Sequence, residues 1–130
     1  MSEMSNFLEN ALINATLRAT TYTSVATVYV SLWTSDPTDA GSGTEVSTSG
    51  TSYARTAVTF GAPSGGASTN SADVTFPTAT ASWGTVGWIG INDAATSGNL
   101  LYHTALDTAK AIDSGDIFKI STGNLSVTLA

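Results

Sequence analysis

The spacing of apolar residues changes once along the chain, near residue 25. Before that point, apolar side chains recur at the three- and four-residue spacing of one helical face: Met4, Phe7, Leu8, Ala11, Leu12 and Ala15. This spacing predicts an amphipathic helix over residues 6–18. Asn6 is expected to be its N-cap, and Glu9 lies in the first turn, where a carboxylate favours the positive end of the helix.

After residue 25 the apolar period becomes two, which is typical of β-strands. The clearest case is the strand predicted at 25–33, in which Val28, Val30 and Leu32 share one face. A second segment, 83–92, is expected to form a central strand, whose glycines permit a bulge or a close approach of two sheets. Further strands are predicted at 53–60, 71–76, 100–106, 108–112, 117–120 and 125–129.

About eight strands preceded by one helix predict an all-β fold, a jelly-roll-like β-sandwich with a short N-terminal amphipathic helix. The strand number suits two four-stranded sheets. An immunoglobulin-like sandwich has a similar number of strands, but it usually contains a buried cystine, and this chain has no cysteine. We expect one domain over 1–130, with a helix or arm at 6–18, a sandwich at 25–129, and an exposed, mobile loop at 35–51.

Hydroxyl side chains replace most of the charge on this protein. Ser and Thr account for 39 of the 130 residues, whereas charged residues make up 11%, well below the roughly 25% of an ordinary soluble domain. The net charge is −6, and the four basic residues are scattered along the chain. Binding of nucleic acid needs clustered Lys and Arg, so we expect none. Residues 1–14 resemble neither a signal peptide nor a membrane span, so we expect synthesis in a cytoplasm and no membrane partner.

The residues that carry chemistry are sparse. His103 is the sole histidine and is predicted to be structural, since one imidazole without a nearby Cys or second His makes a poor metal site. The close carboxylate pairs, Asp36 with Asp39 and Asp113 with Asp116, lie in turn sequences, where Asp caps the backbone. We therefore expect no catalytic residue, no cofactor, no metal ion and no small-molecule ligand, and the protein is not expected to be an enzyme.

Apolar and aromatic side chains are the remaining candidates for function. The helix either covers its own domain or acts as an arm on a neighbouring subunit. Tryptophan side chains either pack in a core or interface, or stack on sugars. The candidate interface residues are Met4, Phe7, Leu8, Ala11, Leu12, Trp83 and Trp88.

Several sequence words resemble a family of short virion proteins of tailed bacteriophages. They lie at 28–37 (VYVSLWTSDP), 43–47 (GTEVS), 53–63 (YARTAVTFGAP), 71–77 (SADVTFP) and 90–95 (GINDAA), and the resemblance extends to 7–12 (FLENAL) and 125–129 (LSVTL). Members of this family are labelled capsid cement (decoration) proteins or tail fibre proteins. The resemblance implies no catalytic residues.

This resemblance implies a structural virion protein. We expect a cement protein that forms a dimer or trimer on the outer capsid surface and stabilises the shell by binding the major capsid protein. The alternative is a small tail or tail fibre component that contacts host-surface glycans. For the first function, removal of residues 1–18 is expected to weaken attachment and leave the β body folded.

Overall fold

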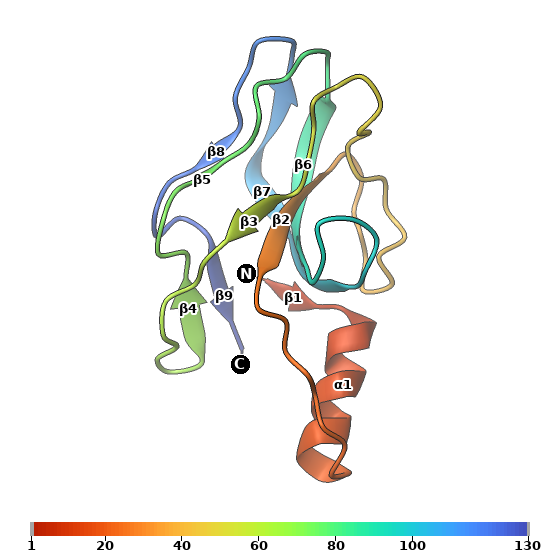
Figure 1. Cartoon of the computed structure of the whole chain (residues 1–130), viewed down its shortest axis with the longest axis vertical. Coiled ribbons are helices and arrows are strands. Elements are labelled where there is room, and N and C mark those ends of the chain that lie inside the picture. The colour runs from red at the N-terminus through yellow and green to blue at the C-terminus, as the bar shows by residue number, and fades with distance from the viewer. Residues whose placement is uncertain (1, 130) are drawn as a thin grey trace.

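The computed structural model describes residues 2–129 and confirms the all-β sandwich prediction (Figure 1). One helix accompanies nine strands in this part of the chain. The helix is α1 (Asn6–Leu17), and the strands are β1 (Glu3–Met4), β2 (Val28–Trp33), β3 (Thr56–Val58), β4 (Ala67–Thr69), β5 (Val74–Thr75), β6 (Gly84–Asn92), β7 (Leu100–Ile112), β8 (Lys119–Ile120) and β9 (Ser126–Thr128).

The strands form one large antiparallel sheet and two small ones. The large sheet has the order β1-β7-β6-β2-β3, whereas β4 pairs with β9 and β5 pairs with β8. Val74 of β5, and Phe76, Phe118 and Leu125, which directly adjoin the strands of the small sheets, belong to the core that covers one face of the large sheet. The described strands are thus divided five, two and two, instead of the expected four and four. One reason is Pro77, which has no N–H to extend the ladder of β5.

Strand β6 is central, as predicted, and lies between β7 and β2. Simple alternation along 83–92 predicts that Val86 and Ile89 face opposite ways, but both side chains lie in the same core. A shift in register between Val86 and Trp88 reverses the alternation at this point. Strand β7 is one continuous strand where two were expected. The expected break at residue 107 falls within this irregularity, since Ala105 pairs with Trp88 and Lys110 with Val86.

The segment before β3 departs from its prediction. Only Thr56–Val58 pairs with β2, so the strand expected at 53–60 is much shorter. Simple alternation along 53–60 predicts Tyr53 on the face opposite Val58, yet both side chains are buried in the core. Outside the ladder, the backbone at residue 53 no longer has to alternate, and the aromatic ring turns inward.

The loop at 35–51 is anchored at several points, whereas a freely exposed loop was expected. Val46 is buried, and its N–H donates to the carbonyl of Leu32 at 3.0 Å. The N–H of Thr34 likewise donates to the carbonyl of Thr44 at 2.9 Å. Pro37 is fully buried. The loop therefore continues the edge of the sheet beside the last residues of β2.

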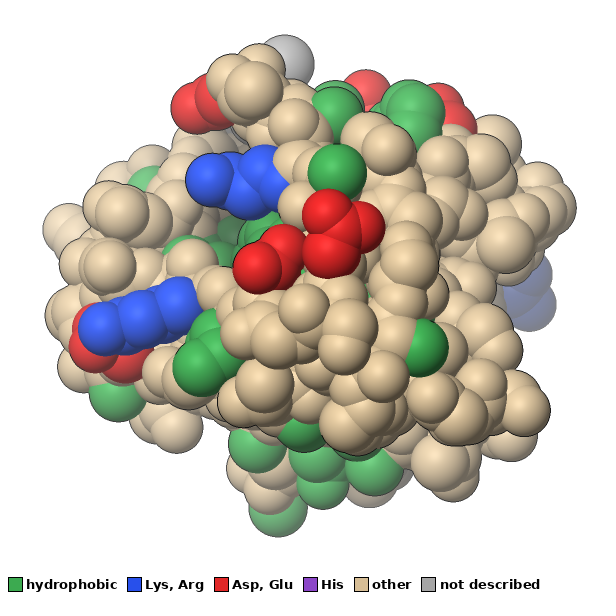
Figure 2. Space-filling view, turned by 90° about the horizontal axis from the view of Figure 1, so that it is seen from above, with side chains coloured by type: hydrophobic (Ala, Val, Ile, Leu, Met, Phe, Trp, Pro, Cys, Tyr) green, Lys and Arg blue, Asp and Glu red, His purple; other side chains and the backbone are tan. Residues whose placement is uncertain are grey.

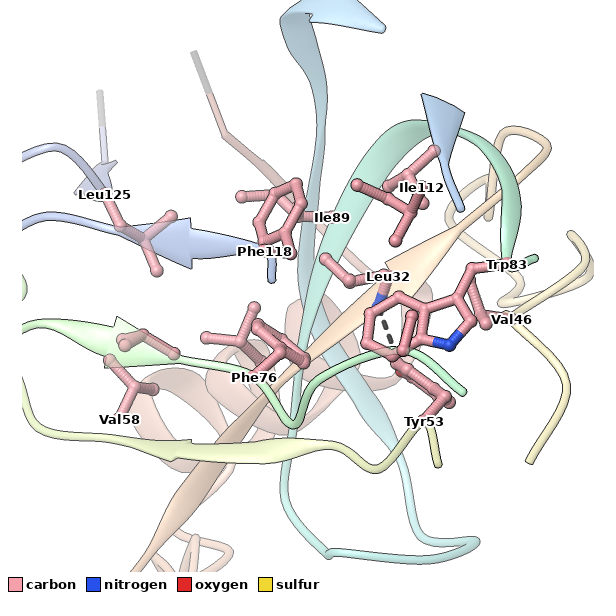
Figure 3. Packing of buried hydrophobic residues seen from close by; sticks show 14 of the residues in the cluster. Leu32, Val46, Tyr53, Val58, Phe76, Trp83, Ile89, Ile112, Phe118 and Leu125 are labelled. Atoms are coloured by element: carbon pink, nitrogen blue, oxygen red, sulfur yellow. Dashed lines mark hydrogen bonds between the residues drawn. The ribbon is translucent and has the colours of Figure 1, made fainter. Parts of the chain in front are cut away.

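Aromatic side chains occupy the centre of the core (Figure 3). The ring of Trp83 meets that of Tyr53 edge-on, with centroids 5.4 Å apart and planes at 81°. Phe76 makes similar edge contacts with Trp83 and Phe118, at 6.4 and 5.6 Å. Such edge-to-face geometry places the positive ring edge against the negative ring face, and each pair contributes about 0.5–1.5 kcal/mol beyond burial.

The ends of α1 are set by local hydrogen bonds. Ser5, not the expected Asn6, is the N-cap: its Oγ accepts from the N–H of Leu8 at 3.2 Å. The same hydroxyl donates to the carbonyl of Leu100 at 2.5 Å, which ties the N-cap to the first residue of β7. At the other end, Ala19 adopts a left-handed φ of 55°, and the N–H of Thr20 donates to the carbonyl of Asn14. This turn sends the chain back toward β2.

Candidate functional site

The strands and loops from β2 onward, residues 28–129, are called the β body. The N-terminal helix projects from the β body, and residues 18–27 return along it to β2 (Figure 1). Leu8 anchors the base of the helix and is buried. Further along, Phe7 and Ala11 line a shallow groove together with Tyr22 of the returning segment. The helix and this segment, residues 5–27, are called the helix unit below.

The helix unit leaves large apolar side chains in solvent. Ile13 is 53% exposed and Leu17 is 79% exposed. They are four residues apart and so lie together on the helix surface. At 3.6 residues per turn this surface is opposite the one that carries Leu8. Ile13 and Leu17 therefore form an apolar pair that points away from the rest of the chain.

The predicted helical stripe divides between contacts within the chain and exposure. Leu8 is buried, Met4, Ala11 and Leu12 are partly buried, and Phe7 is 42% exposed. Most of the stripe thus packs against the protein's own β7 and returning segment. The apolar stripe does not include Ile13 and Leu17, so the helical pattern does not predict this exposed pair. The feature of the sequence that indicates it is two large aliphatic residues, four positions apart, outside the stripe.

The two tryptophans of the candidate interface have different environments. Trp83 is 4% exposed, and its indole Nε1–H donates to the carbonyl of Thr51 at 2.8 Å. Because its ring is enclosed by the chain's own core, Trp83 is not available to a partner, and we remove it from the candidate interface. Trp88 is partly exposed and lines a hollow near the base of the helix with Glu3 and Asp36. Trp88 shares this hollow with Glu3 of β1, the strand that precedes the helix.

The base of the helix is fastened to the body by polar contacts. The N–H of Ser5 donates to the carbonyl of Leu101, and the N–H of Asn6 donates to the carbonyl of Asp39, both at 2.9 Å. The side chain of Asp39 also lies 2.8 Å from Nε2 of His103, which is 4% exposed on β7. These contacts hold the first turn of the helix to both the sheet and the 35–51 loop.

Near this junction, three residues of the large sheet, Ser31, Trp33 and Asn92, are buried and form a polar network. Trp33 donates from Nε1 to Oγ of Ser31 at 2.8 Å, and Ser31 donates to Oδ1 of Asn92 at 2.6 Å. Gly90 lies opposite, and a Cβ added there would come within 2.8 Å of the Ser31 hydroxyl and 2.7 Å of Leu100. Only glycine at this position leaves room for the network, which packs tightly near the contacts that hold the helix.

A second polar network links the core to two loops. Arg55 forms a bidentate ion pair with Glu45, with nitrogen to oxygen distances of 2.8 and 2.9 Å, and donates to the carbonyls of Ala94 and Ser97. The hydrogen bond to Glu45 raises the pKa of Arg55. The hydroxyl of Tyr53 donates to Glu45 at 2.6 Å. Burial, and then this hydrogen bond, raise the pKa of Tyr53 well above its ordinary range.

Both predicted carboxylate pairs take part in turns. Asp36 accepts from the N–H of Thr38 at 2.9 Å, and Asp116 accepts from the N–H of Asp113 at 2.9 Å. These hydrogen bonds are the turn caps expected from the sequence. The side chain of Asp39 makes a different contact from those of Asp36 and Asp116, since it lies against the imidazole of His103.

The surface is predominantly uncharged. Figure 2 shows a face on which most atoms are backbone or uncharged polar side chains, with a few acidic and basic groups and some hydrophobic side chains among them. Over residues 2–129, the only helix is too short to span a membrane. This surface offers hydroxyl and amide groups and scattered charges to a partner, so the apolar residues of the helix unit differ from most of their surroundings.

The family is established by comparison with known proteins. The model of the family described as "Podophage GP4 fiber I protein gp80" matches residues 3–128, which includes both the helix unit and the β body. No curated protein sequence matches the chain. The chain therefore belongs to the podophage GP4 fiber I protein gp80 family, and it is a structural virion protein of a tailed phage.

Proposed function

We propose that this protein is a small fibre-type subunit of the phage tail that attaches to the virion through its helix unit. The observation that carries the proposal is the exposed pair of Ile13 and Leu17, on a helix whose base is fixed to the body. The family description, a fibre protein, favours the tail over the shell. In this function the protein acts by association and catalyses no reaction.

Burial of the apolar pair supplies a reason for attachment. Complete burial of one large aliphatic side chain contributes about 1.5–3 kcal/mol of favourable free energy. In most interfaces a few well-buried side chains supply most of the binding free energy. Ile13 and Leu17 give two such anchors, and Phe7 adds a third at the edge of the same helix. Because the helix base is held by hydrogen bonds to β7 and the 35–51 loop, a partner bound to the helix would also fix the orientation of the body.

The second candidate function is a capsid cement protein on the outer surface of the major capsid protein. Two observations favour it: the described chain is compact and has no extended shaft, and its net charge of −6 suits a surface that faces away from packaged DNA. In both functions the helix unit is the attachment site, so the two differ in the partner that it binds.

The copy number of the protein per virion distinguishes the two functions. A cement protein repeats one contact over the whole shell, so on the order of hundreds of copies are expected, whereas a tail position gives about a dozen or a few dozen. Quantitative mass spectrometry of purified virions against the portal protein measures this ratio. A count in the hundreds would refute the tail proposal and support the cement function.

Contact of a tail subunit with host glycans depends on Trp88, because Trp83 is part of the core. The partly exposed ring of Trp88 lies beside carboxylates of Glu3 and Asp36, an arrangement in which a sugar ring can stack and also form hydrogen bonds. Glycan-array binding that is lost in Trp88→Ala and kept in Tyr22→Phe, which changes an aromatic residue of the helix unit outside this hollow, would support this. An array without binding would remove the glycan contact and leave the attachment proposal in place.

Self-association into a dimer or trimer is part of the same proposal. The exposed apolar pair is a candidate contact between copies as well as with the virion. Light scattering of the purified protein, coupled to size exclusion, measures the oligomeric state. A dimer or trimer that dissociates in an Ile13→Ser/Leu17→Ser variant would assign the helix to contacts between copies, and an unchanged oligomer would assign it to the virion partner.

A further inference from the structure

Three side chains from distant parts of the sequence converge at the base of the helix. Glu3 comes from β1, Asp39 from the 35–51 loop and His103 from β7. Nε2 of His103 lies 2.8 Å from Oδ1 of Asp39 and 3.8 Å from Oε2 of Glu3. The three ligand atoms all lie within 4.8 Å of one another. We propose that Glu3, Asp39 and His103 bind one divalent transition-metal ion, for which Zn²⁺ is the best match.

The spacing of these atoms is close to that of a metal site. Zn²⁺ binds imidazole nitrogen and carboxylate oxygen at about 2.0–2.2 Å, so neighbouring ligand atoms of a tetrahedral site lie about 3.3 Å apart. The observed separations of 2.8 and 3.8 Å lie on either side of this value. Small rotations of the two carboxylates are therefore enough to admit an ion between them and the imidazole.

The local structure fixes the histidine and leaves the carboxylates accessible. His103 is held between two neighbouring strands, opposite Glu3 of β1 and Gly90 of β6, and its side chain is 4% exposed. The side chains of Glu3 and Asp39 are 67% and 48% exposed. An ion can thus enter from solvent through the carboxylates and reach an imidazole that is already in position.

The charge at this point also favours a cation. Among residues 2–129, the ion-pair partner of Glu3 and of Asp39 is His103, and no Lys or Arg pairs with either carboxylate. The two carboxylates together carry two negative charges, which one divalent cation balances.

The donor types select the kind of ion. Imidazole favours Zn²⁺ and its neighbours in the first transition row, whereas Ca²⁺ and Mg²⁺ prefer sites made entirely of oxygen. Three protein ligands leave a fourth position, and the hollow beside His103, which is also lined by Asp36 and Trp88, has room for a water ligand there. No sequence pattern predicts this site, because its ligands are separated by 36 and 64 positions.

The ion would cross-link β1, the 35–51 loop and β7 where the helix begins. Binding should therefore stiffen the junction between the helix unit and the body. This inference rests on the geometry of the three side chains and holds whether the protein attaches to the tail or to the shell.

Titration calorimetry of the full chain after dialysis against EDTA tests the site. With ZnCl₂ we expect saturable binding of one ion per chain and an increase in Tm, and with CoCl₂ a visible absorption band from a four-coordinate ion. CaCl₂ and MgCl₂ should bind at least about 10-fold more weakly. Absence of saturable Zn²⁺ binding, or a preference for Ca²⁺, would overturn the proposal.

Ligand variants locate the ion. Glu3→Gln and Asp39→Asn change exposed side chains, so they should fold and yet bind Zn²⁺ at least about 10-fold more weakly. His103→Gln should abolish the cobalt band. The matched control is Asp107→Asn, which removes a carboxylate from the same hollow but not from the triad, and it should bind as the wild type does. Unchanged affinity in both Glu3→Gln and Asp39→Asn would overturn the assignment.

Discussion

The β body and the helix unit differ in the burial of their apolar side chains. In the body, aromatic and aliphatic residues from all three sheets bury one another, and each buried polar side-chain atom among the described residues has a hydrogen-bond partner. In the helix unit, Leu8 is buried, whereas Ile13 and Leu17 remain in solvent. The body therefore has what it needs to fold through its own contacts. The helix unit keeps apolar surface available, and this asymmetry is the physical basis for assigning attachment to it.

The largest expected effect is the removal of the central aromatic ring of the body. Trp83→Ala leaves a cavity among Tyr53 and Phe76 and deprives the carbonyl of Thr51 of its donor. We expect a loss of about 3–5 kcal/mol in the free energy of unfolding, measured by urea denaturation. Trp88→Ala is the matched control and should cost less than half as much, since its ring is partly exposed. A loss below about 1 kcal/mol for Trp83→Ala would contradict the description of the core.

A smaller effect is expected when one hydroxyl is removed from the same core. Tyr53→Phe leaves the N–H of Leu32 without the acceptor that it has in the wild type and removes one hydrogen bond to the carboxylate of Glu45, which keeps its ion pair with Arg55, so we expect a loss of about 1–3 kcal/mol. The control, Tyr22→Phe in the helix unit, should change stability by less than about 0.5 kcal/mol. Equal effects in the two variants would show that the polar network of the body contributes no more than the surface of the helix unit.

The raised pKa of Tyr53 adds a dependence on pH. The folded protein keeps this phenol protonated to higher pH than the unfolded chain, whose tyrosines ionise near pH 10. The stabilisation is fully present below pH 10 and is lost as the pH rises through the folded value. Unfolding of the wild type followed by circular dichroism should show stability decreasing above pH 10, and the decrease should be shallower in Tyr53→Phe. A decrease of the same slope in both proteins would contradict the assignment to Tyr53.

On the surface of the body, a weaker dependence on acid pH is expected from Asp73. Hydrogen bonds from the backbone and side chain of Thr122, and then contacts with Lys119, lower the pKa of this exposed carboxyl below 3.8. Its contribution is therefore present above pH 3.8 and disappears as the pH falls through the folded value. Asp73→Asn should be slightly less stable than the wild type at neutral pH, and this difference should vanish in strong acid. A difference that persists there would exclude the ionised carboxylate as its cause.

The smallest effect on stability is expected in the helix unit. Ile13→Ser/Leu17→Ser removes side chains that touch solvent, so the free energy of unfolding of the isolated protein should change by less than about 1 kcal/mol. Leu8→Ser, on the opposite side of the same helix, should be clearly more destabilising, because Leu8 is buried. An equal loss in the free energy of unfolding for the double variant and for Leu8→Ser would contradict the description of Ile13 and Leu17 as exposed side chains.

The parts of this structure that follow local rules could be predicted from the sequence. The helix and the strands at β2 and β6 were found because apolar residues recur there with a clear period. The bulge that brings Val86 to the core and the inward turn of Tyr53 could not be found, since both depend on where the ladder ends. The same reason applies to the helix base. Ser5 is the N-cap because its hydroxyl also reaches Leu100, a residue that only the fold brings near.

The most direct test of the central claim is the occupancy of the Ile13→Ser/Leu17→Ser protein on virions. The variant and the wild type are supplied in trans to phage that lack the protein, and the amount bound is measured by quantitative mass spectrometry after particle purification. Asn10→Ser, at another exposed position of the same helix, controls for changes in the helix itself. We predict that occupancy falls by at least about 10-fold in the double variant, as expected for the loss of two interface anchors, and stays near the wild-type level in Asn10→Ser. Wild-type occupancy of a correctly folded double variant would contradict attachment through the helix unit.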